Sequence, residues 1–247
     1  MEYSYLTDPG KIRDHNEDSV TIVKNESGEI LLAVADGMGG HKGGEIASSI
    51  AITNIGKRFL NTSTVGNKED AIRFIKEIVS EANVLLYKYT KENPESSGMG
   101  TTIVLSLLTD KFLLFGNIGD SSGFVIKEGK LYKITEDHTL VNLLVKSGEL
   151  TKEEAKDHPR KNVLMRALGA NMDVEMDIFD IETSVDGIFL CSDGLTNMLD
   201  FQQIERVLNS TLTIDEKLQK LILKANNRGG NDNISVAYLT KEVKNDK

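Results

Sequence analysis

Apolar segments that follow one another across very short turns restrict the folds open to this chain. Residues 101–108 and 112–118 are separated by only three residues, and residues 123–127 and 131–134 flank a turn at Gly129. Connections this short join antiparallel strands, because parallel strands need a crossover of a dozen or more residues. The sequence therefore predicts a fold rich in hairpins.

Three amphipathic helices separate the strands. Apolar residues recur at spacings of three and four over residues 45–60, 69–92 and 213–225. The last of these begins with a capping box formed by Thr213 and Glu216. Long helices set between runs of hairpins favour antiparallel sheets that pack on each other with helices outside, so we predict a layered fold of the α+β class.

Two further segments allow more than one arrangement. Residues 174–178 alternate in polarity, and we expect them to form a hairpin with residues 187–191 across a turn at Asp186. Residues 135–170 contain only short helical pieces. From the pattern alone, this stretch is either a lobe over a functional site or a surface connection without a role.

Composition limits the class of protein. We treat the 247 residues as one domain, in which a hydrophobic content of 39% can fill a core. The net charge of -9 opposes binding to nucleic acid or anionic lipid, and no apolar stretch approaches the ~20 residues needed to cross a bilayer. The N-terminus lacks a signal-peptide pattern and the single Cys191 cannot form a disulfide within the chain, so we expect a cytoplasmic protein.

Five aspartates lie at the ends of strongly apolar runs. Asp36, Asp120 and Asp193 each follow such a run, and Asp18 and Asp232 each precede one. Aspartate is depleted from strands, so these positions are informative. If the five strands are central, their ends bring the five carboxylates together at one edge of the core.

An ordinary turn is the alternative for each position, because Asp-Gly is favourable turn chemistry. We assign that simple role to Asp186, which lies between two strand-like segments. The residues after Asp36 and Asp193 instead lead into helices. A hairpin turn therefore does not account for these two aspartates.

Carboxylates gathered at the edge of a core repel one another unless cations compensate them. Oxygen ligands suit Mg²⁺ or Mn²⁺, and the backbone carbonyl of Gly37 can contribute. Two dications would leave about one uncompensated negative charge, which Arg13 can cancel while offering a planar fork to a phosphate. His41 could donate a proton to a leaving alkoxide. Taken alone, Arg13 and His41 are ordinary surface residues.

Eight short motifs, in order along nearly the whole chain, resemble those of the metal-dependent protein serine/threonine phosphatases of the protein phosphatase 2C family, in particular its bacterial single-domain members. The motifs are RDHNED at 13–18, DGMGGH at 36–41, GMGTT at 98–102, GDS at 119–121, DHT at 137–139, HPRKN at 158–162, SDGLTN at 192–197 and GGNDNI at 229–234. Each motif is weak evidence alone, but eight in order are highly specific.

The resemblance implies a four-layer α-β-β-α sandwich, with two Mn²⁺ or Mg²⁺ ions at one end and a mobile flap formed by residues 135–170. Asp36 would bridge the two ions, the Gly37 carbonyl would bind one, and Asp193 and Asp232 would bind the other. A hydroxide bridging the ions would attack the phosphorus of phosphoserine or phosphothreonine directly, without a cysteine nucleophile.

The resemblance also implies roles for the residues around the two ions. Asp18 would hold a metal-bound water, and Asp120 would form a third, weaker metal position with Asp193. Arg13 would hold the phosphate and His41 would be the general acid. The chain has Ser122 where the family commonly has Arg after the GDS motif, which bears on the local support of Asp120.

The expected organisation is a single catalytic domain over residues 1–240 and a polar tail over residues 241–247. The family resemblance implies phosphoprotein substrates, a serine/threonine kinase that shares them, and a monomer. Two alternatives stay open: a two-metal phosphohydrolase for small phosphate esters, and a non-catalytic module that binds phosphoproteins.

Overall fold

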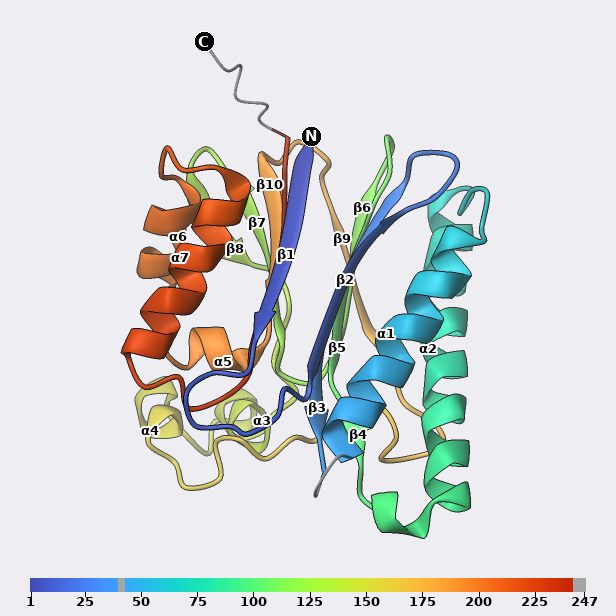
Figure 1. Cartoon of the computed structure of the whole chain (residues 1–247), viewed down its shortest axis with the longest axis vertical. Coiled ribbons are helices and arrows are strands. Elements are labelled where there is room, and N and C mark those ends of the chain that lie inside the picture. Colours follow the sequence, from blue (N-terminus) through green and yellow to red (C-terminus); the bar gives the residue numbers. More distant parts are fainter. Residues whose placement is uncertain (40–42, 242–247) are drawn as a thin grey trace.

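Two antiparallel sheets face each other at the centre of the molecule, and helices cover the outer face of each sheet (Figure 1). The computed structural model describes residues 1–39 and 43–241. In spatial order, the strands of the first sheet are β1 (Glu2–Asp8), β11 (Ile234–Thr240), β10 (Gly187–Cys191), β7 (Ser122–Lys127) and β8 (Lys130–Lys133).

The second sheet carries one extra short strand, β4 (Gly100–Thr101), which pairs with the end of β3. In spatial order, its strands are β2 (Asp18–Lys24), β3 (Ile30–Met38), β5 (Ile103–Leu108), β6 (Leu113–Ile118) and β9 (Asp177–Ile181). The predicted hairpins are confirmed, since β5 pairs with β6 and β7 pairs with β8, both antiparallel.

The predicted hairpin between residues 174–178 and 187–191 is wrong. β9 pairs with β6 in the second sheet, whereas β10 pairs with β7 and β11 in the first. The connection between them crosses from one sheet to the other, and Val185 is buried in the core between the sheets. A local polarity pattern identifies a strand but does not choose its partner.

Helices α1 (Gly43–Leu60) and α2 (Lys68–Glu92) cover the second sheet (Figure 1). Helices α6 (Phe201–Leu208) and α7 (Ile214–Asn227) cover the first, together with the short α5 (Asp193–Thr196). The predicted capping box is present: Glu216 N donates to Thr213 Oγ1, and Thr213 N donates to a carboxylate oxygen of Glu216. The four-layer sandwich expected from the sequence is therefore confirmed.

Alternating side chains of β3 explain its unbroken apolar sequence. Leu31 and Ala33 pack toward α1 and α2, whereas Leu32 and Val34 pack between the two sheets. All four are fully buried. A strand that is covered on both faces is apolar throughout, and its first polar side chain, Asp36, comes where the cover ends.

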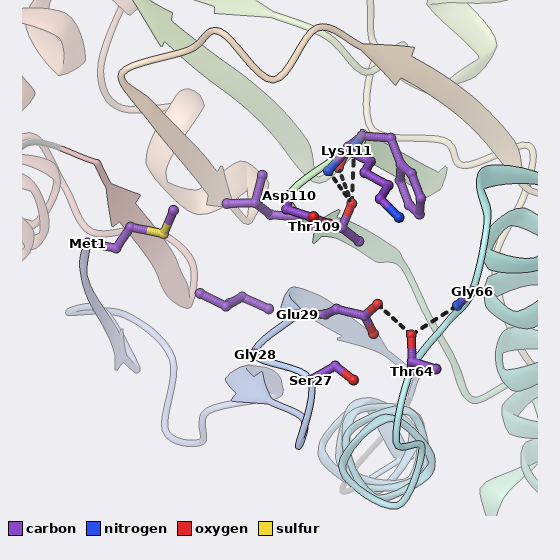
Figure 2. Close-up of a pocket in the computed structure, with 12 residues that line it drawn as sticks. Met1, Ser27, Gly28, Glu29, Thr64, Gly66, Thr109, Asp110 and Lys111 are labelled. Atoms are coloured by element: carbon purple, nitrogen blue, oxygen red, sulfur yellow. Dashed lines mark hydrogen bonds between the residues drawn. The ribbon is translucent and has the colours of Figure 1, made fainter.

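The two ends of β3 lie in different surroundings. At its start, a pocket of about 420 Å³ is lined by the buried Glu29, whose carboxylate accepts a hydrogen bond from Thr64 Oγ1 (3.0 Å) (Figure 2). The same carboxylate accepts hydrogen bonds from Asn25 Nδ2 (2.6 Å) and Val65 N (2.9 Å). These bonds tie the β2–β3 turn to the α1–α2 connection. The predicted site residues that the structure describes, which leave out His41, belong to the other end, about 25 Å away along the strand.

Candidate active site

Strand ends from both sheets meet around an acidic pocket of about 440 Å³. Its lining includes the carboxylates of Asp36, Asp120, Asp193 and Asp232, which are four of the five aspartates singled out in the sequence. Glu17 is a fifth carboxylate in the wall and was not predicted. Its position in the RDHNED motif, one residue before Asp18, was the only signal for it.

Asp18 is buried just behind this wall. It begins β2 and lies directly opposite Asp36 in the β2–β3 register. Its Oδ2 accepts a hydrogen bond of 2.7 Å from Ser192 Oγ, while its Oδ1 is buried without a hydrogen-bond partner among the described residues. Burial raises the pKa of Asp18 to about 7, and the charges of Asp193 and Asp232 act in the same direction.

Two threonines hold the backbone of Asp36. Asp36 N donates to Thr102 Oγ1 (2.9 Å), and the Asp36 carbonyl accepts from Thr101 Oγ1 (2.9 Å) and Thr102 N (2.9 Å). Burial, and then the neighbouring charge of Asp18, raise the pKa of Asp36 well above its usual value. Both threonines belong to the GMGTT motif, but no role was predicted for them.

Glycines follow Asp36 and Asp193 because other backbone segments pass very close. A Cβ on Gly37 would lie 2.1 Å from the carbonyl oxygen of Gly44, and one on Gly194 would lie 2.0 Å from the carbonyl oxygen of Asn233. No side chain fits at such distances. The Asp-Gly pairs therefore serve close packing at the site, as well as the turns that their sequence allowed.

Asp193 and Asp120 complete the inner wall. Asp193 is the first residue of α5, where its Oδ2 accepts a hydrogen bond from Asn197 Nδ2 (3.0 Å). Burial raises the pKa of Asp193 and raises that of Asp120 to about 8. The negative charge of Asp232 also raises the pKa of Asp193, and that of Asp193 raises the pKa of Asp120, so the fold brings together acidic groups that repel one another.

Asp232 forms the outer wall with Arg13. Arg13 Nη2 lies 2.9 Å from Asp232 Oδ2, and both side chains are more than a third exposed. Asn233 fixes the surrounding loops: its Oδ1 accepts from Glu17 N (2.8 Å), and its Nδ2 donates to the carbonyl of His15 (2.9 Å). The buried Asn233 thus supports the Asp232 loop.

The stretch 135–170 contributes the remaining wall. It contains α3 (Leu140–Ser147) and α4 (Lys152–Lys156), and residues 164–167 line the acidic pocket. Of the two arrangements left open by the sequence, the stretch therefore lies over the site. Its Leu168 pairs with Thr101 in an isolated bridge, which ties it to the support of Asp36.

Two sequence expectations concern residues outside or away from this pocket. His41 lies outside the described residues, as does the polar tail after Lys241. Cys191 is fully buried, and burial raises the pKa of its thiol. A buried thiol held in its neutral form is not a nucleophile, in keeping with the expectation that Cys191 has no catalytic role.

The donor chemistry of the pocket fits hard divalent cations. All of its acidic groups offer oxygen ligands. Burial, together with the charges of neighbouring carboxylates, raises the pKa of Asp18, Asp36, Asp120 and Asp193, which favours cations among them. No three His, Cys, Asp or Glu side chains within residues 1–39 and 43–241 are arranged as a finished metal-binding group. Asp232 pairs with Arg13 and accepts a hydrogen bond from Asn233 N (2.9 Å).

This fold and this acidic pocket are those of a known class of enzyme. The family model described as protein phosphatase 2C matches residues 12–225. The chain therefore belongs to the protein phosphatase 2C family, as its eight motifs indicated.

Individual relatives extend the similarity over almost the whole chain. The serine/threonine phosphatase stp of Listeria monocytogenes is 38% identical over 245 residues, which cover 98% of this chain and 97% of the relative. The solved S. agalactiae serine/threonine phosphatase is 38% identical with a TM-score of 0.92, covering 98% of this chain and 99% of that one. A structure of the PstP catalytic domain in complex with two manganese ions is 32% identical with a TM-score of 0.82, covering 96% of both chains.

No helix in the described part of the chain has the length and apolar composition needed to span a membrane.

Proposed function

We propose that this chain hydrolyses phosphoserine and phosphothreonine in proteins, with two Mn²⁺ or Mg²⁺ ions held in the acidic pocket. The observation that carries the proposal is the convergence of the carboxylates of Asp36, Asp120, Asp193 and Asp232 on one pocket, with Asp18 buried behind its wall. Such a cluster needs cations, and cations convert it into a surface that accepts a phosphate. The names of the relatives, and the two manganese ions in the PstP structure, support the same conclusion.

In this proposal the carboxylates of Asp36, Asp193 and Asp232 and the backbone carbonyl of Gly37 would hold the two ions. When bound, such ions lower the pKa of a water molecule and neutralise charge on phosphate oxygens. Asp18 holds a water from behind the wall, where its Oδ1 has no other partner among the described residues. Asp120 and Asp193 form a third, weaker metal position.

Arg13 binds the phosphoryl group in the same proposal. Its guanidinium now pairs with Asp232 at 2.9 Å, and its side chain is 47% exposed, so it is free to turn toward a ligand in the pocket. A planar guanidinium binds two phosphate oxygens at once, which orients the ester. His41 protonates the departing alkoxide, a role inferred from the DGMGGH motif alone.

Residues 1–240 act as one catalytic domain, with residues 135–170 as a mobile flap beside the substrate. The substrates are phosphoproteins that a serine/threonine kinase also acts on, and the enzyme works as a monomer in the cytoplasm. The net charge of -9 and the single buried Cys191 support this placement.

Asp193→Asn tests the role of the ions. We expect at least a roughly hundredfold lower kcat/KM for a phosphothreonine peptide, because losing a metal ligand removes several kcal/mol of transition-state stabilisation. Calorimetric titration with Mn²⁺, in the absence of substrate, should show weaker binding. The exposed Asp173→Asn variant, which removes one carboxylate elsewhere, is the matched control.

Substrate comparison separates this function from its alternatives. A peptide turned over with higher kcat/KM than a nucleotide monophosphate supports a protein phosphatase, and the reverse order indicates an enzyme for small esters. Phosphopeptide binding without phosphate release would indicate a binding module. Hydrolysis that persists after chelation of divalent ions would contradict the metal-dependent scheme.

A further inference from the structure

His138 holds both polar groups of the Gly119 backbone. Gly119 N donates a hydrogen bond to His138 Nδ1 (3.2 Å), and the Gly119 carbonyl accepts one from His138 N (2.9 Å). Gly119 directly precedes Asp120, so its carbonyl belongs to the planar peptide group that joins the two residues. A residue 19 positions along the chain therefore fixes the backbone that brings Asp120 to the wall of the acidic pocket.

The Gly119 backbone has little room to move. Its φ is +104°, a conformation that favours glycine, and a Cβ there would lie 2.5 Å from Thr102 Cγ2. The buried Asn117 also donates from Nδ2 to the Gly119 carbonyl (3.1 Å). Thr102 is one of the two threonines that hold the backbone of Asp36. The position of Gly119 therefore bears on the supports of both Asp120 and Asp36.

The hydrogen bonds of the His138 ring fix its orientation and its tautomer. A backbone N–H can only donate, so Nδ1 accepts from Gly119 N and carries no proton. The other ring nitrogen, Nε2, then carries the proton and lies 3.1 Å from Asp177 Oδ2. Only 9% of the His138 side chain is exposed. A mostly buried ring that is held at both nitrogens cannot turn without losing a hydrogen bond.

Asp177, the first residue of β9, is itself held by a second partner. Arg166 Nη1 donates to Asp177 Oδ1 (2.8 Å), while Oδ2 is the atom near His138. Burial acts to raise the pKa of Asp177, but the hydrogen bonds from His138 and Arg166 outweigh it and lower the pKa below its usual value. Met165 N also donates to the His138 carbonyl (2.7 Å). Since Met165 and Arg166 line the acidic pocket, His138 joins the backbone before Asp120 to another part of the same wall.

We propose that His138 is a positioning residue for Asp120: it holds the Gly119 backbone through Nδ1 and its main-chain N, and Asp177 keeps the ring turned toward Gly119. His138 belongs to the DHT motif, but no role was predicted for it. Partners of this kind orient a ligand before a cation binds, so that the cation does not have to order it. The proposal rests on the proposed function in assigning Asp120 to a metal position.

Two amide substitutions separate the two sides of the ring. His138→Asn places an oxygen near the position of Nδ1 and keeps an acceptor for Gly119 N, whereas His138→Gln places its amide near Nε2 and removes that acceptor. His138→Gln should weaken Mn²⁺ binding at the Asp120 position about tenfold or more, and His138→Asn should weaken it less than about threefold. Calorimetric titration without substrate measures both affinities, and the ion that Asp120→Asn removes identifies the position.

Asn142→Ala is the matched control for a general loosening of the segment. Asn142 Nδ2 donates to the Asp137 carbonyl (2.7 Å), a bond that does not involve Gly119. Its loss should lower the unfolding midpoint by about 2 to 4 °C and leave Mn²⁺ binding unchanged. Equal Mn²⁺ affinities at the Asp120 position in the Asn and Gln variants would overturn the proposal, as would a control that weakens binding as much as His138→Gln does.

NMR spectroscopy of the metal-free wild-type protein at mildly alkaline pH tests the hydrogen bond itself. We expect a scalar coupling across the hydrogen bond between the Gly119 amide nitrogen and His138 Nδ1, and a proton on Nε2 rather than on Nδ1. A proton on Nδ1, or the absence of the coupling, would overturn the proposal. This measurement decides even if a variant does not fold.

The same experiments keep this proposal apart from the proposed function. If Asp120→Asn leaves the Mn²⁺ titration unchanged, Asp120 holds no ion and the role of His138 is refuted, whether or not the wild-type protein hydrolyses a phosphopeptide. A wild-type protein that binds the ion at Asp120 without hydrolysing the phosphopeptide refutes the proposed function instead, and the comparison of the Asn and Gln variants still decides the role of His138.

Discussion

Ser192 Oγ donates a 2.7 Å hydrogen bond to Asp18 Oδ2, and this bond joins the two sheets at the edge where the carboxylates gather. Ser192 follows β10 of the first sheet, and Asp18 begins β2 of the second. The same hydroxyl accepts a hydrogen bond from Ser235 N (2.9 Å) on β11. One small side chain therefore fixes three strand ends relative to each other, and with them the spacing of the acidic groups that they carry.

Ser192→Ala should destabilise the protein by about 1 to 3 kcal/mol, because it removes a bond to a buried carboxyl that has no other partner for its second oxygen among the described residues. It should also raise the pKa of Asp18 further, since the serine hydrogen bond lowers it. Denaturant unfolding of the metal-free protein measures the change in stability. Ser184→Ala, which removes an exposed hydroxyl, should have almost no effect; equal losses in the two variants would contradict this role of Ser192.

Stability should depend on pH with a sign set by the raised pKa values. Asp18 and Asp120 have pKa values of about 7 and about 8, against an ordinary 3.8. Between about pH 4 and pH 8 the folded protein therefore binds protons that the unfolded chain has released, so stability falls as pH rises through this range.

Thermal unfolding in chelator should accordingly show a falling midpoint from pH 5 to pH 8. Saturating Mn²⁺ should reverse the trend, because the ions replace the protons as the compensating charge. A metal-free midpoint that rises with pH across this range would show that burial does not raise the pKa values of these carboxyls.

Gly194→Ala should disrupt the site, because the added Cβ would lie 2.0 Å from the Asn233 carbonyl oxygen. Overpacking of this kind costs about 1 to 3 kcal/mol and displaces the backbone next to Asp193. We expect lower stability in denaturant together with weaker Mn²⁺ binding by calorimetry. Gly56→Ala is the matched control, because Gly56 lies in α1 and an added Cβ would meet no atom closer than 3.9 Å. This variant should stabilise the helix by about 0.5 to 1 kcal/mol.

Glu29→Ala should separate stability from activity. The buried Glu29 carboxylate holds Asn25, Thr64 and Val65 at the far end of β3. Its loss leaves these donors unpaired, so we expect about 2 to 3 kcal/mol lower stability with kcat/KM unchanged at a temperature where the variant is folded. Glu26→Ala is the control, because Glu26 is exposed and lies in the same β2–β3 connection, and it should change neither quantity. A large fall in kcat/KM for Glu29→Ala would show that the two ends of β3 are energetically linked.

Local chemistry made much of the architecture predictable from the sequence. The capping box of Thr213 and Glu216 sets the start of α7, and the short turn at Gly129 leaves β7 and β8 no arrangement except a hairpin. Likewise, the first carboxylate after the apolar run of β3 marks where burial on both faces ends. Each of these signals lies within a few residues of the feature that it determines.

The composition of the site was predictable only in part. The aspartates at the strand ends could be selected because the residues that follow Asp36 and Asp193 do not continue as hairpins. Glu17 and the paired threonines that hold Asp36 were missed, since a backbone hydrogen bond to a residue 65 positions away leaves no trace in local pattern. Family motifs contained these residues without revealing what they contact.

Tertiary structure alone decided which strands and which charges meet. β9 pairs with β6 rather than with β10, and Arg13 pairs with Asp232 across 219 positions. The sequence determined where strands and helices begin, where their apolar faces lie and which acids stand at their ends. It could not determine the partners, because pairing between distant segments depends on how whole sheets pack and on the charges that this packing brings together.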